Sequence, residues 1–588
     1  MKTKTQNLIV RLSVTFFGLP LLICGLLVSQ GTAAAGSWTK LNRGAPGPVN
    51  MMLLLADGTV MAQRAPFGTN FTSTWYRLTP NNGSYVDGTW TTRTPMTSTR
   101  LYYSSAVLRD GRVLVAGAEY GTGWNTAEIY NPSSDSWSPA TVPTGLITQN
   151  NNPGAPPNNQ NTAGFTDSIC KILPNGNVMV APNFPTTPGG TLIYNPGANS
   201  WSAGPTWLGS QNEASWVKLP DDSILTVDKN TTASERYIPA LNVWTNDANL
   251  PVTLYDAISE LGAAFLLPNG RVIFFGGTGQ TALYTPSGNL APGKWVAGPV
   301  IPAGQGCSDA AAAMMELNGK ILCAVGPSGV FNPPTSFYEY DYLDLTAGTN
   351  GSFTQVGGPT GGLTDTNIPP SQANAVIAYQ TIMLVLPDAS ILYSDATTNL
   401  YTYLPGGFPR ISSVPTISSI TANGNGSYHL TGTKLNGHSE GAAYGDDAQM
   451  DSNYPLVRAT DGSGNVLYLP TYNWSSTSVQ TGNNPVSTEF FAFQSLTPGA
   501  AYSLVAVANG ISSDPVTFYG PVWVDFNSVN PFQFGLYDFP YHTLGQAISA
   551  VPATGTINIK TAGHTTETMT ISKPMTIVAI GGPATIGQ

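Results

Sequence analysis

Six acidic or phenolic residues recur at one position of a repeated pattern. Each stands eight or nine residues before a turn sequence such as Asp110-Gly111. The six residues are Tyr102, Asp167, Glu213, Glu260, Asp309 and Tyr379. Carboxylates and phenols gathered around one opening could bind a cation, or hydrogen-bond a sugar or a basic side chain. Like charges held close together should also raise the pKa of some of these carboxyl groups.

The competing interpretation is a water-filled opening, whose polar residues only satisfy the ends of strands. Both interpretations depend on strand register, because a slip of one residue turns a side chain to the other face of its sheet. The first repeat breaks the series with Pro48 and Val49.

Short strands in repeated units would position these residues. In the unit from Leu101 to Trp137, two apolar runs flank Asp110-Gly111, a strong hairpin signal because this turn needs positive φ. The corresponding turns are Asp57-Gly58, Asp110-Gly111, Asn175-Gly176, Asp221-Asp222, Asn269-Gly270, Asn318-Gly319 and Asp388-Ala389. Aromatic residues recur as well, at Tyr130, Tyr194, Tyr237, Tyr284 and less cleanly Tyr338, and at Trp90, Trp137, Trp201, Trp244 and Trp295.

This spacing gives seven units of roughly fifty residues, the size of a four-stranded propeller blade. The last unit, near Leu400 to Leu404, lacks its Trp strand, and Ser37-Trp38-Thr39 near the N-terminus looks like that strand. We therefore expect a closed ring in which the N-terminus completes the final blade and no sheet edge is exposed.

The units resemble kelch repeats. Followed by a C-terminal β-domain, they resemble the galactose-oxidase-like group of secreted propeller proteins, over roughly Ser37 to Val522. The resemblance implies an all-β chain with a seven-bladed kelch-type β-propeller at 36–409. An immunoglobulin-like β-sandwich of the galactose-oxidase C-terminal type would follow at 410–526.

The last segment, 527–588, has a different pattern. A short helix is predicted over Thr543 to Val551, before strands at Thr556–Ile559, Thr568–Ile571 and Met575–Ala579. The segment resembles the opening coil of a right-handed parallel β-helix of the pectate-lyase-like kind. Solenoids generally need three or more repeats, so either further sequence follows or the tail docks elsewhere.

The resemblance to copper oxidases can be examined residue by residue. Those enzymes carry a Cys cross-linked to a Tyr, an axial Tyr directly followed by a His ligand, and a second His from the C-terminal domain. Tyr102 and Tyr379 match the two tyrosines, while Gln380 and Gln449 stand at the histidine positions and the Cys position falls near Met51. Amides are poor copper ligands beside imidazole, so a dismantled copper site is expected.

One acidic run could hold a calcium ion. The oxygen-rich run at 444–454 contains Asp446, Asp447 and Asp451, which could hold calcium. The alternative is a solvated loop that reaches over the propeller. No other cofactor is expected.

The mature chain would keep Cys170, Cys307 and Cys323. The second and third could form a disulfide, and the alternative is three buried free thiols.

The N-terminus predicts export. Residues 1–35 combine early basic residues, an apolar run and Ala33-Ala34-Ala35, a pattern typical of a cleaved signal peptide, although an uncleaved anchor helix is the alternative. The expected location is therefore outside the cell or at its surface, with no membrane span after cleavage. A net charge of −10 argues against nucleic acid as a partner.

Two long insertions, Thr148–Asn161 and about Gly348–Gln372, join the outer strand of one unit to the inner strand of the next. Such loops emerge on one face of a propeller, where ligands usually dock. They could equally be inert surface insertions.

Three functions follow from the sequence. The leading hypothesis is a secreted, non-catalytic propeller protein that binds a carbohydrate or a protein at the channel-mouth face, with a role in adhesion or in cell-surface or extracellular-matrix contact. The second is an enzyme, either galactose-oxidase-like or polysaccharide-active, with an altered site. The third is a structural part of a larger surface β-helix protein. Whether the chain is an enzyme stays open, with the missing copper ligands arguing against it.

Overall fold

The computed structural model describes most of the chain from Gly36 to Gln588. The described ranges are 36–66, 70–147, 168–182, 190–210, 214–309, 313–346, 348–370, 372–440, 443–444, 448–449, 453–492 and 496–588. The predicted signal peptide, 1–35, lies outside them. Within these ranges, no helix has both the length and the apolar character needed to cross a bilayer.

Seven sheets in the described ranges share a plan of four antiparallel strands, to which one sheet adds one strand and another adds two, and we number them as blades 1 to 7 in chain order. Blade 1 has β2 (Val49–Leu54), β3 (Val60–Arg64), β4 (Trp75–Asn81) and β5 (Ser84–Arg93). Blade 2 has β7 (Ser104–Val107), β8 (Val113–Ala116), β10 (Ala127–Asn131) and β11 (Ser136–Pro139). Blade 3 has β12 (Ile169–Ile172), β13 (Val178–Ala181), β14 (Gly190–Asn195) and β15 (Ser200–Thr206). Blade 4 has β16 (Val217–Lys218), β17 (Ile224–Val227), β18 (Ser234–Ile238) and β19 (Val243–Asn246).

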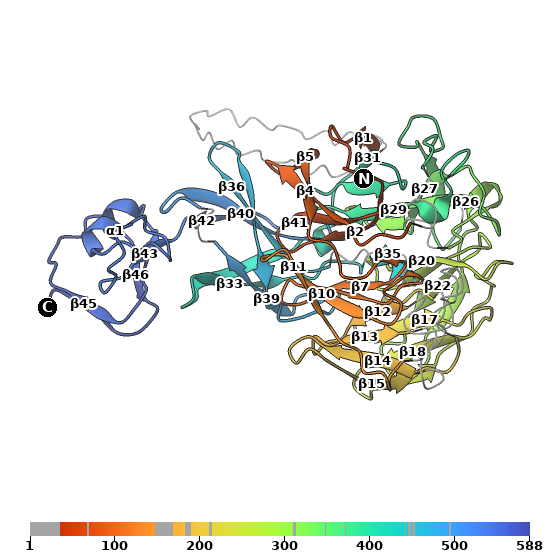
Figure 1. The fold of residues 1–588 in the computed structure, drawn as a ribbon, viewed down its shortest axis with the longest axis horizontal. Coiled ribbons are helices and arrows are strands. Elements are labelled where there is room, and N and C mark those ends of the chain that lie inside the picture. The colour runs from red at the N-terminus through yellow and green to blue at the C-terminus, as the bar shows by residue number, and fades with distance from the viewer. Residues whose placement is uncertain are drawn as a thin grey trace, which may run out of the picture. The chain divides into compact units, whose positions relative to one another are not determined.

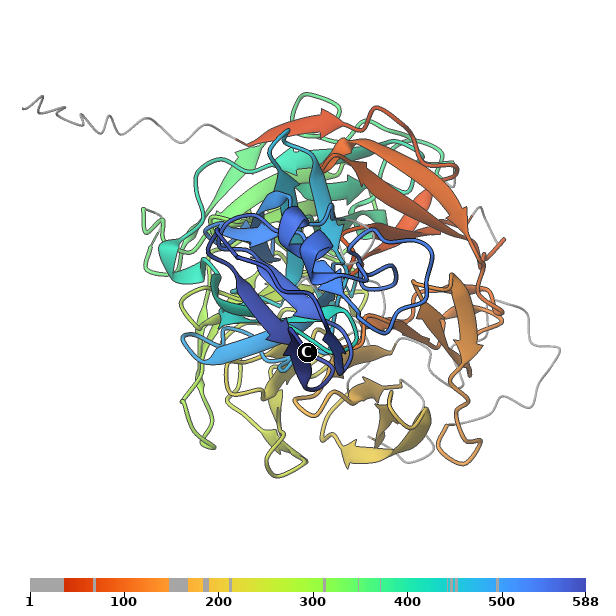
Figure 2. The ribbon, with the colours of Figure 1, turned by 90° about the vertical axis from the view of Figure 1, so that its left-hand side faces the viewer.

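The other blades repeat this plan. Blade 5 has β20 (Leu261–Leu266), β21 (Val272–Gly276), β22 (Thr281–Thr285) and β23 (Lys294–Ala297). Blade 6 has β25 (Ala313–Met315), β26 (Ile321–Pro327), β27 (Ser336–Asp341) and β28 (Ser352–Val356), with β24 (Gln305–Gly306) beside β26. Blade 7 has β29 (Ile382–Val385), β30 (Ile391–Ser394), β31 (Leu400–Leu404) and β1 (Ser37–Lys40). Figure 2 shows the blades following one another around a ring, from red through orange and yellow to green. The prediction of an all-β propeller is confirmed.

The predicted hairpin turns join the first two strands of each blade. At all seven turns the second turn residue has positive φ, from 64° at Asp222 to 89° at Gly319. The first residue accepts a hydrogen bond from the backbone two positions on, as at Asp57, where the Thr59 N–H donates at 3.0 Å. Asx geometry of this kind stabilises the turn locally, which is why the sequence signal was reliable.

The aromatic repeat pairs the third and fourth strands. Tyr130 lies directly opposite Trp137, with ring centroids 5.0 Å apart, and the same pairing recurs at Tyr194–Trp201, Tyr237–Trp244 and Tyr284–Trp295. In blade 6 the prediction of Tyr338 was wrong. Tyr340 faces Phe353 there, whereas Tyr338 faces Gln355, because the strand runs two residues further before its turn.

The N-terminal strand closes the ring, as predicted. β1 pairs antiparallel with β31, placing Trp38 opposite Tyr403. The Trp38 Nε1–H donates to the Gly357 carbonyl at 2.6 Å, as the Trp137 Nε1–H does to the Thr94 carbonyl at 2.9 Å. On the inner side, the Ser394 hydroxyl of blade 7 donates to the Val49 carbonyl of blade 1 at 2.8 Å. Blade 7 is therefore held at its outer edge and at its second strand by residues from the start of the described chain.

Two antiparallel sheets follow the propeller (Figure 1). One contains β32 (Thr416–Ala422), β33 (Ser427–Thr433), β39 (Pro485–Phe491) and β38 (Thr471–Tyr472). The other contains β37 (Val466–Leu469), β36 (Leu456–Asp461), β40 (Ala501–Ala508), β41 (Ile511–Ser512) and β42 (Val516–Tyr519). Both sheets contribute to one apolar core around Leu430, Phe490 and Leu504. We call this unit the sandwich; its immunoglobulin-like type stays a prediction.

One segment of the sandwich, 471–480, crosses the hairpin turns of five successive blades. The Thr471 N–H donates to the Ala56 carbonyl in blade 1, and the Trp474 carbonyl accepts from Arg109 in blade 2. The hydroxyls of Thr477 and Ser478 donate to the Leu173 carbonyl in blade 3 and to Asp222 in blade 4. The Gln480 amide donates to the Leu267 carbonyl in blade 5. The sandwich therefore covers the end of the propeller where the hairpin turns lie. We call the opposite end of the inner strands the mouth.

A hairpin of the sandwich enters the propeller. β34 (Ala443–Tyr444) and β35 (Ala448–Gln449) pair with each other, and Ala443 pairs with Ala264 in the middle of inner strand β20. β35 also contacts β7, the inner strand of blade 2. The sequence predicted a loop over the propeller here, but the described backbone instead extends blade 5 between inner strands.

A buried ion triad ties the sandwich to blades 3 and 4. The Glu440 carboxylate lies 3.6 Å from the Lys171 ammonium and 3.3 Å from that of Lys218, and all three residues are buried. Burial alone would raise the pKa of Glu440, but the two ammonium groups and the Lys218 backbone N–H, at 2.8 Å, outweigh it and hold that pKa below its usual value.

The tail begins with a parallel sheet of three strands, β43 (Val522–Val524), β44 (Thr556–Ile559) and β46 (Thr576–Ala579). β44 lies in the middle and pairs with both of the others. β45 (Gly563–Thr565) and β47 (Ala584–Ile586) form a second parallel pair. The predicted helix is present as α1 (Leu544–Ala550). Thr543 and Gln546 form a capping box at its N-terminus. The predicted strand at Thr568–Ile571 was wrong, since that segment has no strand. Parallel pairing suits a β-helix, which stays a prediction.

Replacing Trp38 should weaken ring closure. Trp38→Ala removes a ring that packs on Phe337, Tyr393 and Tyr403 and deletes the bond to Gly357. We expect the free energy of unfolding to fall by about 2–4 kcal/mol, measured by urea titration. Lys40→Ala, an exposed change on the same strand, is the control. Equal stability of the two variants would contradict closure by β1.

Neutralising Glu440 should destabilise the chain strongly. Glu440→Gln leaves two buried ammonium groups without a counter-charge, a change that typically costs about 3–5 kcal/mol. Urea titration would measure this loss. A triple variant, Lys171→Met, Lys218→Met and Glu440→Leu, removes all three charges and should recover most of it. Failure to recover would show that the loss in Glu440→Gln does not come from the two unpaired ammonium groups.

Candidate functional site

The structure places the described members of the predicted series at the mouth. Tyr102 precedes β7, Glu260 precedes β20, Asp309 precedes β25 and Tyr379 precedes β29, so all four stand at the same end of inner strands. Asp167 and Glu213 lie outside the described residues. Convergence of all six on one ligand stays a prediction.

One aromatic cluster at the mouth forms around Tyr102. Its ring lies 6.2 Å from the ring of Tyr120, which in turn stacks on Phe71 at 5.4 Å. All three rings are half-buried. Tyr120 and Phe71 come from the connections between the second and third strands of blades 2 and 1, which reach the mouth like the starts of the inner strands.

Arg100 holds this cluster in place. Its buried guanidinium donates to the carbonyls of Gly117, Gly123 and Thr126 at 2.7, 2.8 and 3.0 Å and forms an ion pair with Glu128 at 2.9 Å. The loop that carries Tyr120 is thus wrapped around one side chain. β6 (Arg100–Leu101) also pairs with β9 (Tyr120–Gly121), which brings Tyr120 beside Tyr102.

A second aromatic cluster forms around Tyr379. Its ring centroid lies 5.0 Å from that of Phe331, which is 40% exposed. The Gln380 amide N–H donates to the Tyr379 hydroxyl at 3.2 Å. The amide oxygen of Gln380 is buried and has no hydrogen-bond partner among the described residues. Both residues lie in the short 3-10 turn Ala378–Gln380.

Asp256 and Ser308 fix the segments that carry Glu260 and Asp309. The Asp256 carboxylate accepts the Glu260 backbone N–H at 3.1 Å and the Ser308 hydroxyl at 2.6 Å. Asp309 follows Ser308 directly and has a φ of 49°. The two acidic positions of blades 5 and 6 are therefore linked through one carboxylate.

The sequence analysis missed Phe71, Tyr120, Phe331 and Arg100. The aromatic residues occupy connections between second and third strands, which share the mouth with the starts of inner strands. Aligning the connections between second and third strands across the repeats, as was done for the starts of the inner strands, would have found these aromatic residues. Arg100 had no such signal, since its role depends on a loop that closes around it.

The copper-site positions can be placed in part. Tyr102 and Tyr379 are described above, and Gln449 lies on β35 of the β34–β35 hairpin. Asp446, Asp447 and Asp451 lie outside the described residues, so the calcium prediction is not tested. Across the described ranges, no three His, Cys, Asp or Glu side chains form a group that could hold a metal. The amides at Gln380 and Gln449 do not fit copper, which prefers imidazole and thiolate.

The three cysteines, Cys170, Cys307 and Cys323, are buried and free, which matches the second of the two alternatives raised for them. The hydrogen bond with Cys307 and burial both raise the pKa of the Cys323 thiol, so it stays protonated and unreactive.

A Gly-x-Ser-x-Gly pattern at 437–441 resembles the nucleophile motif of hydrolases. Ser439 is fully buried, and no helix follows it in the described chain as that motif requires. The neighbouring His438 bonds Ser413 at 3.0 Å, and burial lowers its pKa to about 4. The pattern is structural here.

Buried carboxyl groups support two mouth loops. Burial raises the pKa of Asp228 to about 8, and the hydrogen bond with Glu235 is the second cause of this rise. Burial and the charge of Asp395 raise the pKa of Asp365 to about 6. Asp365 lies in the predicted insertion 348–372 and accepts the Tyr393 hydroxyl at 2.8 Å. These groups are 6% exposed or less, so they anchor loops rather than meet a ligand.

Comparison with known proteins gives fold-level likeness only. No protein-family model matches the chain, and no curated protein matches it. A fungal alcohol oxidase of the AA5 family, in complex with copper, is 13% identical over 83% of this chain and 99% of its own, with a TM-score of 0.46. An inactive variant of virginiamycin B lyase from Staphylococcus aureus, with quinupristin, is 10% identical over 63% of this chain and 99% of its own, with a TM-score of 0.39.

The Asp365–Asp395 pair should make stability depend on pH. Between pH 3.8 and about 6 the unfolded chain loses the Asp365 proton while the folded chain keeps it, so unfolding becomes easier as pH rises. Asp395→Asn removes one charge and should lower the pKa of Asp365, giving a shallower decline.

Urea titrations at pH 4, 5, 6 and 7 would measure this slope for wild type and variant. Asp514→Asn, which removes an exposed carboxyl group, controls for loss of one charge. An unchanged slope in Asp395→Asn would contradict coupling between the two carboxyl groups.

Proposed function

We propose that this chain is a secreted, non-catalytic propeller protein that binds a carbohydrate at its mouth. The observation that supports this most directly is the pair of aromatic clusters, Tyr102–Tyr120–Phe71 and Phe331–Tyr379. Sugar rings pack their C–H faces on aromatic rings while polar groups at the rim bind their hydroxyls. The carboxylates of the predicted series would supply such acceptors.

Backbone strain supports a functional role for the mouth. Tyr102 and Asp309 have φ values of 52° and 49°, and a bulky Tyr in this region is an outlier. Strain of this kind persists where the surroundings fix a residue, and it gathers at binding sites. The Arg100 hydrogen bonds and the Asp256–Ser308 contact provide that fixation.

The unpartnered Gln380 oxygen offers a buried acceptor beside the Tyr379 ring. A buried polar atom without a partner is costly, and a ligand hydroxyl would satisfy it. Secretion is part of the proposal and follows from the N-terminal pattern of 1–35.

A second candidate is an enzyme with an altered site. It is favoured by the β34–β35 hairpin, which brings Gln449 into the channel while Tyr379 and Gln380 lie at the mouth. Incubation with copper salts followed by metal analysis tests the galactose-oxidase-like form of this candidate. Stoichiometric copper would support the enzyme, and peroxide assays would follow.

Removing the mouth aromatics should weaken carbohydrate binding at the mouth. The double variant Tyr102→Asn and Tyr379→Ala deletes one ring from each cluster, and Asn tolerates the positive φ at position 102. Isothermal titration calorimetry with cellohexaose, maltohexaose and hexagalacturonate is the measurement. We expect affinity for the tightest of these probes to fall at least tenfold.

Tyr472→Ala removes a half-buried ring of the sandwich, far along the chain from the mouth residues, and is the matched control. Unchanged affinity in the double variant would rule out the mouth. Binding of a protein instead of any sugar would move the proposal to a protein ligand.

A further inference from the structure

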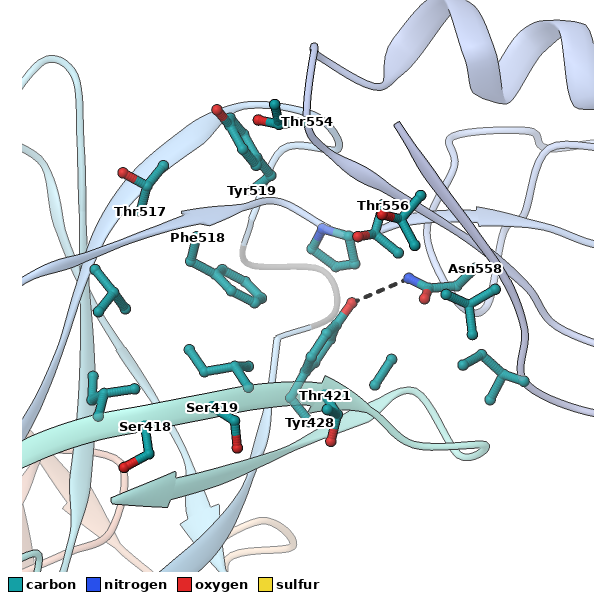
Figure 3. A pocket seen from close by; sticks show the side chains of 18 residues that line it. Ser418, Ser419, Thr421, Tyr428, Thr517, Phe518, Tyr519, Thr554, Thr556 and Asn558 are labelled. Carbon is teal, nitrogen blue, oxygen red and sulfur yellow. Dashed lines mark hydrogen bonds between the residues drawn. The ribbon is translucent and has the colours of Figure 1, made fainter. Parts of the chain in front are cut away.

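A cleft of about 780 Å³ lies between the sandwich and the tail. This volume falls within the range of about 300–1,000 Å³ typical of ligand sites. Figure 3 shows the side chains that line it, from β32, β33 and β42 of the sandwich and from β44 and β46 of the tail. None of the 18 described residues that line the cleft carries a charge, and half of them carry a hydroxyl group.

Tyr428 and Asn558 face each other across this cleft (Figure 3). The Asn558 amide N–H donates to the Tyr428 hydroxyl at 3.4 Å, which leaves the phenolic proton available to a ligand. Burial raises the pKa of Tyr428, so that proton stays in place at neutral pH. Asn558 is 2% exposed, and its amide oxygen has no partner among the described residues. The cleft thus presents one donor and one acceptor side by side.

This arrangement suits two adjacent hydroxyls of a sugar. One hydroxyl can donate to the Asn558 oxygen while its neighbour accepts from the Tyr428 hydroxyl. Phe518, whose ring meets Tyr428 edge to face at 5.2 Å, offers an apolar surface beside them. Without charged side chains, the lining gives no compensation for desolvating an acidic sugar. We propose that the cleft binds a neutral oligosaccharide, at a site independent of the mouth.

An extended peptide is less suited to the cleft. β32, β42 and β46 are edge strands in the described sheets. However, β32 has an irregular register between Ile417 and Ser419, and β42 has only four residues. Bulges and short edges are the features that prevent strand addition. Side-chain hydroxyls, rather than a backbone ladder, are what the cleft offers.

The test is calorimetry of the mature full chain with cellohexaose and maltohexaose, with hexagalacturonate as the acidic counterpart. We expect at least one neutral probe to bind, and hexagalacturonate to bind at least tenfold more weakly in this cleft. Tyr428→Phe keeps the ring and its packing but removes the hydroxyl, and should weaken neutral-probe binding about tenfold. Thr556→Val, an isosteric change of a lining hydroxyl, should also weaken it.

Tyr472→Phe, on an aromatic residue outside the lining, is the matched control and should bind like wild type. The mouth variant Tyr102→Asn and Tyr379→Ala separates the two sites, because cleft binding should survive it. Neutral-probe binding that persists in Tyr428→Phe and Thr556→Val but disappears in the mouth variant would overturn the cleft and support the mouth. Absence of neutral-probe binding, or binding of an uncharged Ser-Thr peptide in its place, would also overturn the proposal.

Discussion

Closure of the ring by four residues at the start of the described chain is the constraint on which the other features depend. Without β1, blade 7 would expose the edge of β31, an open template for strand addition. Trp38 reproduces the role of the outer Trp in blade 2 by bonding to a carbonyl of the preceding blade. Because closure fixes every inner strand relative to its neighbours, it also fixes the positions from which the mouth residues start.

The sandwich makes the two ends of the propeller different. Segment 471–480 bonds to the hairpin turns of five blades, and the Glu440 carboxylate is the shared ion-pair partner of two buried lysines. Buried ion pairs rarely add net stability, but separating their partners is costly. The triad therefore determines the position in which the sandwich docks on the propeller more than it adds to the stability of that contact. With one end covered by the sandwich, the proposed binding site lies at the other end, where the inner strands start.

The sequence predicted what is encoded locally and missed what depends on distant contacts. Hairpin turns such as Asp110-Gly111 and aromatic pairs such as Tyr130–Trp137 were found because each depends on residues less than ten positions apart. The pairing of Ala443 with Ala264 was not found, because nothing local marks two residues so far apart as partners. The mouth positions were predicted, but their aromatic neighbours Tyr120 and Phe331 were not, since they lie on other connections of the blades.

Charge is scarce in this chain, and much of it is used internally. Only 10% of residues are charged, and Arg100–Glu128, Arg236–Asp247 and the Glu440 triad keep several of them buried. Coulomb attraction between surface charges is screened within about 10 Å at moderate salt. Under both proposals, recognition would therefore depend on hydrogen bonds and aromatic contact. Both the mouth and the cleft offer those two interactions, which is the combination that neutral sugars require.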